Sequence, residues 1–139
     1  MSETVHASAV AWEGRALLIR GQSGSGKSAL SLALMAMGCD LVGDDRVTLR
    51  EEGGQLFAAP VPTITGLIEA RGVGILHAAH VESARVVCVA DLDHVETDRL
   101  PENRSITLLG CQLPLIYRVE GPHWAASLLQ LLKAGWSDR

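Results

Sequence analysis

Short apolar runs, interrupted by glycine, proline and charged residues, predict many short strands along this chain. Two longer stretches instead repeat apolar residues at helical spacing, and Gly38 is placed to cap the first of them. The predicted strands are 5–11, 16–20, 41–42, 47–49, 56–59, 63–68, 85–90, 106–109 and 113–119, and the predicted helices are 28–37 and 124–134. Because eight or nine strands accompany two helices, the pattern indicates a strand-rich α/β domain without regular alternation.

Length and composition narrow the class of protein. A chain of 139 residues is the size of one domain, so we expect residues 1–139 to form a single domain. The formal net charge is -4 and the arginines are scattered, which argues against nucleic-acid binding. No apolar run approaches the roughly 20 residues that span a bilayer, and the first residues lack a signal-peptide pattern. The three cysteines form no C-x-x-C pair, so we expect reduced thiols and a cytoplasmic location.

A phosphate-binding loop of the form G-x-x-x-x-G-K-[ST] follows the strand at 16–20 and opens the first predicted helix. Its glycines let the backbone turn successive N–H groups toward phosphate oxygens, and the helix N-terminus favours an anion. The lysine reaches the β- and γ-phosphates, and the final hydroxyl is a Mg²⁺ ligand. The candidate nucleotide-binding residues are Gly21, Gln22, Ser23, Gly24, Ser25, Gly26, Lys27 and Ser28. The loop therefore predicts binding of a nucleoside triphosphate with Mg²⁺.

Two adjacent acids, Asp44 and Asp45, follow the very short strand at 41–42. Phosphoryl transfer needs carboxylates near the γ-phosphate, both to hold Mg²⁺ and to position the attacking hydroxyl. Neighbouring residues of a regular strand point to opposite faces. Either the pair lies on a bend that brings both carboxylates to the phosphates, or one of them does the work. A solvated surface turn is the alternative interpretation.

These segments together resemble a known family, the catalytic domain of HPr kinase/phosphorylase. The resemblance rests on four motifs in order: Val5-His6-Ala7, the loop at 21–28, the segment 38–47 around Asp44-Asp45, and Ile-Glu-Ala-Arg-Gly-Val-Gly-Ile at 68–75. It covers residues 5–100, about two-thirds of the chain. The resemblance implies an α/β, strand-rich P-loop domain of the HPr kinase / phosphoenolpyruvate carboxykinase-like type.

The resemblance also implies roles for the acidic pair and its neighbours. Asp44 matches the catalytic acid that takes the proton from the substrate serine. Ser28 and Asp45 match Mg²⁺ ligands, and Lys27 binds the phosphates. His6 matches a histidine close to the reacting phosphate, although a lone histidine in a first strand is more often structural.

Three further residues receive roles from the resemblance. Glu69 matches a second metal ligand, and Arg71 would hold the site together. Without the family, the same two residues are equally well explained as a surface ion pair beside a glycine turn. Arg99, in a short match at 97–100, resembles an arginine that acts on phosphate.

The function implied is that of an ATP-dependent serine protein kinase. Its substrate would be HPr, or an HPr-like phosphocarrier protein of a phosphotransferase system, and the reverse phosphorylase reaction is possible. The family also implies a homo-oligomer, a hexamer. The alternative hypothesis is a nucleotide-binding regulatory or sensor module without kinase activity. A small-metabolite kinase is less favoured, because the length leaves no room for an arginine-bearing lid.

Overall fold

One long strand, β9 (Ala84–Val95), is the centre of the sheet in the computed structural model, which describes residues 1–137. Its first residues pair with β6 (Gln55–Pro60), and its later residues pair with β11 (Cys111–Arg118) along the same edge. The opposite edge pairs in parallel with β3 (Arg15–Arg20). Because β9 has neighbours on both edges, it joins the two halves of the sheet.

The remaining elements complete a nine-stranded sheet, a separate two-stranded sheet and two α-helices within residues 1–137. The larger sheet has the order β1-β5-β6-β9-β3-β2-β4, and β10 is added beyond β11. The other strands are β1 (Ser2–Val5), β2 (Ala7–Trp12), β4 (Asp40–Gly43), β5 (Val47–Glu52), β7 (Leu67–Ala70), β8 (Gly74–His77) and β10 (Arg104–Leu108). The helices are α1 (Lys27–Ala36) and α2 (Trp124–Ala134), and Pro62–Ile64 forms one 3₁₀ turn.

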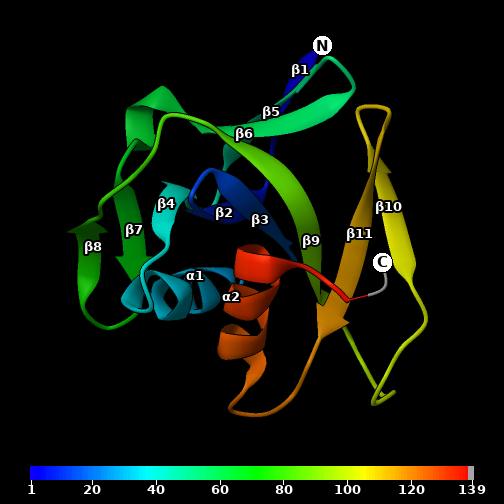
Figure 1. The fold of residues 1–139 in the computed structure, drawn as a ribbon. Coiled ribbons are helices and arrows are strands. Elements are labelled where there is room, and N and C mark those ends of the chain that lie inside the picture. The colour runs from blue at the N-terminus through cyan, green and yellow to red at the C-terminus, as the bar shows by residue number, and fades with distance from the viewer. Residues whose placement is uncertain (138–139) are drawn as a thin grey trace.

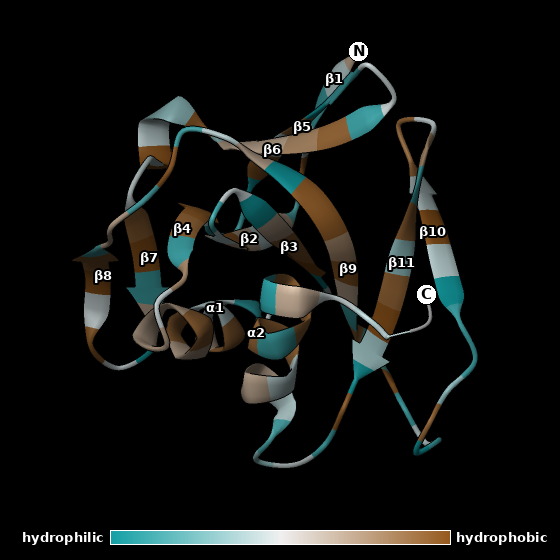
Figure 2. Cartoon of the chain, in the orientation of Figure 1, coloured by the Kyte–Doolittle hydropathy of each residue, from teal (hydrophilic) through white to brown (hydrophobic). Residues whose placement is uncertain are grey.

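The central strands are buried on both faces, and successive side chains alternate between two apolar clusters. In β3, Leu17 and Ile19 face the cluster that includes α1 and α2, whereas Ala16 and Leu18 face the opposite cluster. Figure 1 shows α1 and α2 together on one side of the sheet, with the β5–β6 hairpin and the β10–β11 pair as outlying parts of the same sheet. The middle of β9 and most of β11 carry the hydrophobic colour in Figure 2. The continuous apolar run at 86–90 of β9 agrees with burial on two faces.

The directions of the strands bring four chain segments to one edge of the sheet. β2 is antiparallel to both β3 and β4, so β3 and β4 end at the edge where β2 begins. β9 runs parallel to β3 and therefore ends at this edge as well. The residues that precede β2 and those that follow β3, β4 and β9 consequently lie near one another.

The strand-rich α/β prediction is confirmed, and the differences are local. The run at 5–11 is not one strand, because the chain bends at His6 and β1 leaves to pair with β5. The segment 63–68 is not extended throughout, because Pro62 begins a 3₁₀ turn before β7. Gly38 has a positive φ of 111° and ends α1 as expected. Within residues 1–137 neither helix is long and apolar enough to cross a membrane.

We predict that Leu34→Ala lowers the free energy of unfolding by about 2–5 kcal/mol, since a fully buried leucine leaves a cavity when truncated. Leu34 packs in the cluster between α1 and the sheet. Urea denaturation followed by circular dichroism measures the change. Ala36→Ser, at an exposed position of the same helix, is the control and should cost no more than about 0.5 kcal/mol. Equal losses in the two variants would contradict this packing.

Candidate phosphotransfer site

The phosphate-binding loop connects the end of β3 to the start of α1 at the edge where the strands converge. Gly26 is the N-cap of α1 with a φ of 104°, and its carbonyl oxygen accepts the N–H of Leu30 at 3.0 Å. Gly24 also has a positive φ, 84°, which favours glycine over residues with a side chain. The loop thus leaves the first N–H groups of α1 facing outward, an arrangement that binds anions.

Lys27 is held inside this loop. The residue is only 6 % exposed, and its Nζ donates hydrogen bonds to the carbonyl oxygens of Gly21 at 2.8 Å and Gln22 at 3.1 Å. An ammonium group has three donors, so these two bonds leave one N–H for an anion beside the loop. The curled side chain places a positive charge at the N-terminus of α1.

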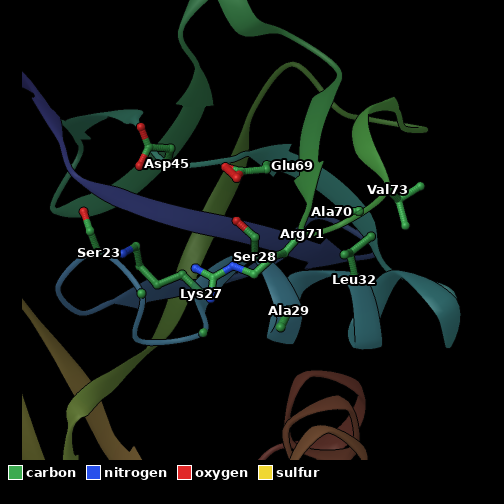
Figure 3. A pocket seen from close by; sticks show the side chains of 12 residues that line it. Ser23, Lys27, Ser28, Ala29, Leu32, Asp45, Glu69, Ala70, Arg71 and Val73 are labelled. Atoms are coloured by element: carbon green, nitrogen blue, oxygen red, sulfur yellow. The ribbon is translucent and has the colours of Figure 1, made fainter.

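A cavity of about 610 Å³ opens beside the loop, between α1 and the β7–β8 hairpin. In Figure 3 the Lys27 and Ser28 side chains lie along one wall, and the carboxylates of Asp45 and Glu69 lie across from them. The cavity is lined by Ser23, Gly24, Gly26, Lys27, Ser28, Ala29, Leu32, Asp45, Glu69, Ala70, Arg71 and Val73. The positive side chains of Lys27 and Arg71 and the negative side chains of Asp45 and Glu69 therefore line the same cavity.

Asp44 is the buried member of the acidic pair, with only 6 % of its surface exposed. Its Oδ1 accepts hydrogen bonds from the hydroxyls of Ser28 at 2.7 Å and Ser8 at 2.9 Å. Its Oδ2 accepts the backbone N–H of Glu69 at 3.0 Å. Three donors satisfy a carboxylate that would otherwise be costly to bury. Asp44 is thus tied to the hydroxyl that the loop motif assigns to Mg²⁺.

Asp45 is the exposed member, and its side chain is 65 % accessible. Its φ is +66°, and Arg46 N–H bonds back to the carbonyl oxygen of Asp44 at 2.7 Å, which closes a γ-turn. The acidic pair therefore lies on a bend, which is one of the two arrangements that the sequence allowed. His6 Nε2 lies 2.9 Å from Asp45 Oδ1, and because a carboxylate only accepts, the imidazole N–H is the donor.

The β7–β8 hairpin supplies the wall opposite the P-loop. It forms its own two-stranded sheet, with Glu69 paired to Ile75 in register. The Glu69 carboxylate points toward Asp45 in Figure 3, and the Arg71 side chain extends toward the P-loop side of the cavity. The hairpin is fixed to the site because the backbone of Glu69 binds Asp44.

The structure does not bring Arg99 to this cavity. Arg99 is exposed and lines a second cavity of about 950 Å³, together with neighbours in 96–104 and residues near the C-terminal helix. The segment after β9 is irregular there, and a short sequence match does not fix its path. Within the described chain, the expectation that Arg99 joins the phosphate site is therefore not supported.

Two polar residues of the site were missed from the sequence, Ser8 and Asp93. Ser8 bonds to Asp44, and Asp93 Oδ1 accepts the N–H of Gln22 at 3.1 Å, which holds the first turn of the P-loop. Both lie at strand ends on the converging edge. The sequence offered two signals for these residues: Ser8 lies inside an apolar run, and Asp93 closely follows the strongest predicted strand.

The donor set suits Mg²⁺ bound together with a nucleotide. No group of three or more His, Cys, Asp or Glu side chains within residues 1–137 forms a metal site by itself. Mg²⁺ ordinarily uses one or two protein oxygens, with phosphates and water completing an octahedron. The Ser28 hydroxyl provides such an oxygen, as do the carboxylates of Asp45 and Glu69 across the cavity. Asp44 accepts a hydrogen bond from the same Ser28 hydroxyl.

The loop, the helix N-terminus and the acidic pair define a P-loop nucleotide-binding domain of α/β class. A family model described as HPr Serine kinase C-terminal domain matches residues 1–107. The chain belongs to this family, as its motifs indicated.

Relatives of known name agree with this family. An HPr kinase/phosphorylase of Streptococcus thermophilus is 35% identical over 127 residues, which cover 81% of this chain and 41% of the relative. One from Exiguobacterium sp. is 47% identical over 64 residues, covering 45% of this chain and 21% of the relative. The chain thus spans less than half the length of these relatives.

A solved structure shares the fold. The HPr(Ser) kinase/phosphatase from Coxiella burnetii superposes with a TM-score of 0.79 at 26% identity, covering 94% of this chain and 88% of that chain. The predicted fold type is therefore confirmed over nearly the whole chain.

We predict that Lys27→Ala weakens binding of Mg²⁺–ATP at least tenfold, because it removes the charged donor at the loop. Isothermal titration calorimetry measures the dissociation constant. Lys133→Ala, which removes the only other lysine and lies at the end of α2, is the matched control and should bind as the wild type does. If both variants bind equally well, Lys27 does not contact phosphate.

Proposed function

We propose that this protein is an ATP-dependent serine kinase acting on HPr or an HPr-like phosphocarrier protein. The observation that carries the proposal is the pairing of Ser28 with buried Asp44, while exposed Asp45 lies in the same cavity. One carboxylate can then act near the metal ion that binds the phosphates, while the other faces the hydroxyl of the acceptor. The names of the relatives supply the substrate class.

The environments of the two acids favour a division of roles opposite to the one implied by the resemblance. Asp44 accepts three hydrogen bonds and does not line the cavity, so it is poorly placed to take a proton from a substrate. Asp45 lines the cavity and accepts a hydrogen bond from His6. We therefore assign proton acceptance to Asp45 and support of Ser28 and Mg²⁺ to Asp44.

The reaction is a direct transfer between two oxygens. The acceptor hydroxyl oxygen forms a bond to the γ-phosphorus while the bond from that phosphorus to the bridging oxygen of ADP breaks. The hydroxyl proton passes to the carboxylate of Asp45, which His6 orients. Lys27 and the N–H groups at the start of α1 hold the phosphates, and bound Mg²⁺ neutralises their charge. Phosphorolysis would use the same groups with inorganic phosphate in place of ADP: an oxygen of that phosphate bonds to the phosphorus of phosphoserine, the bond to the serine oxygen breaks, pyrophosphate forms, and Asp45 returns the proton to the serine oxygen.

The wider assignments belong to the same proposal. ATP and Mg²⁺ are the nucleotide and metal, with Ser28 and Glu69 as candidate oxygen ligands. Residues 1–139 are proposed as one catalytic domain, working in the cytoplasm and assembled into a homo-oligomer as the family resemblance implies. Arg99 lines a different cavity, and its action on phosphate is proposed from the family resemblance alone.

We expect the protein to transfer labelled γ-phosphate from Mg²⁺–ATP to a serine of HPr. Acid-stable phosphoserine, located by mass spectrometry, is the readout. An HPr with the acceptor serine replaced by alanine is the control. If ATP binds but no phosphoserine forms, the sensor hypothesis is preferred.

The division of roles predicts different losses for the two acids. Asp45→Asn should reduce phosphotransfer about 100-fold or more while Mg²⁺–ATP still binds, since it removes the proton acceptor. Asp44→Asn should weaken Mg²⁺–ATP binding, since the amide cannot accept at both oxygen positions. Calorimetry and initial rates separate the two effects. If Asp45→Asn keeps its rate while Asp44→Asn binds ATP normally but transfers nothing, Asp44 is the proton acceptor.

A further inference from the structure

We propose that Ser8 is a positioning residue that sets the turn at Asp45 and so aims the proton-accepting carboxylate into the cavity. This inference rests on the proposed function only for its kinetic consequence.

The Ser8 hydroxyl lies between the two aspartates. Its Oγ donates to Asp44 Oδ1 at 2.9 Å and accepts the backbone N–H of Asp45 at 3.1 Å. Ser8 is fully buried, at 0 % exposure. A hydroxyl is the smallest side-chain group that donates and accepts at once. No apolar residue could replace either bond, and the Asp45 N–H would then be left without a partner.

Ser8 completes a clamp on Asp45 made by three consecutive residues. His6 bonds to the carboxylate, Ala7 N–H bonds to the carbonyl oxygen at 3.0 Å, and Ser8 accepts the N–H. The backbone N–H, the carbonyl oxygen and Oδ1 of Asp45 are therefore all bound by residues 6–8. These three bonds explain how Asp45 keeps a positive φ, a conformation that is strained in a residue with a side chain.

This clamp of residues 6–8 sets the direction of the Asp45 side chain. In a regular strand Asp44 and Asp45 would face opposite sides, and one would leave the site. The left-handed residue breaks that alternation, so Asp44 reaches inward to Ser28 while Asp45 faces the cavity. Ser8 is bonded to both acids and therefore fixes the backbone of Asp45 relative to the side chain of Asp44.

The test uses Ser8→Ala, with Ser31→Ala as the matched control. Ser31 is equally buried, but its hydroxyl makes no hydrogen bond with any residue of 1–137. Ser8→Ala should lower kcat for phosphotransfer to HPr about tenfold while the Kd for Mg²⁺–ATP changes less than twofold. Ser8→Thr retains the hydroxyl and should recover most of kcat. Ser31→Ala should leave both constants unchanged.

A second measurement does not depend on activity. Amide hydrogen exchange of Asp45, followed by nuclear magnetic resonance, should accelerate at least tenfold in Ser8→Ala and stay unchanged in Ser31→Ala. Unchanged exchange overturns the inference, even if the kinase proposal holds. If exchange is faster in Ser8→Ala but the wild-type protein transfers no phosphate, the structural role of Ser8 is supported and only the proposed function is contradicted. Parallel losses of kcat and ATP affinity in Ser8→Ala would assign Ser8 to nucleotide binding instead.

Discussion

The site depends on one buried carboxylate, that of Asp44, whose oxygens must accept hydrogen bonds from the protein. Asp44 is nearly inaccessible, and water cannot replace the hydrogen bonds that it receives from Ser8, Ser28 and the backbone of Glu69. Since a buried charge without donors is strongly unfavourable, the start of β2, the start of α1 and strand β7 must all meet at this side chain. Positions 8, 28 and 69 are far apart in the sequence. Their meeting point fixes the P-loop relative to the hairpin that closes the cavity.

Two adjacent residues of one type acquire different chemistry from their surroundings alone. Asp44 is enclosed by donors, whereas Asp45 is open to the cavity and held at its rim by His6. Placing similar acids in contrasting environments is a general way to obtain distinct catalytic roles. The backbone turn at Asp45 produces the contrast, and bonds from residues 6–8 hold this turn.

The sequence predicted the features that local patterns determine. The P-loop motif, the helix at 124–134 and the apolar core of β9 needed only spacing and composition, and the structure confirms these elements. The break at His6 could not be predicted, because it depends on β1 pairing with β5, about 45 positions away in the chain. The orientation of Asp45 likewise depends on bonds to residues 6–8, and the position of Arg99 depends on an irregular segment. The family resemblance supplied candidate roles, but geometry was required to separate the two acids.

The two walls of the cavity differ in how freely they can change over evolution. In the P-loop wall, Lys27 is buried and bonded to carbonyl oxygens of its own loop, so its replacement would disturb the loop itself. The β7–β8 hairpin belongs to a separate sheet, and β8 is exposed throughout, including Ile75 at 65%. Substitutions at exposed positions usually cost little stability. Strand β8 can therefore change its side chains at little cost in stability, whereas β7 is held by the bond from the Glu69 backbone to Asp44.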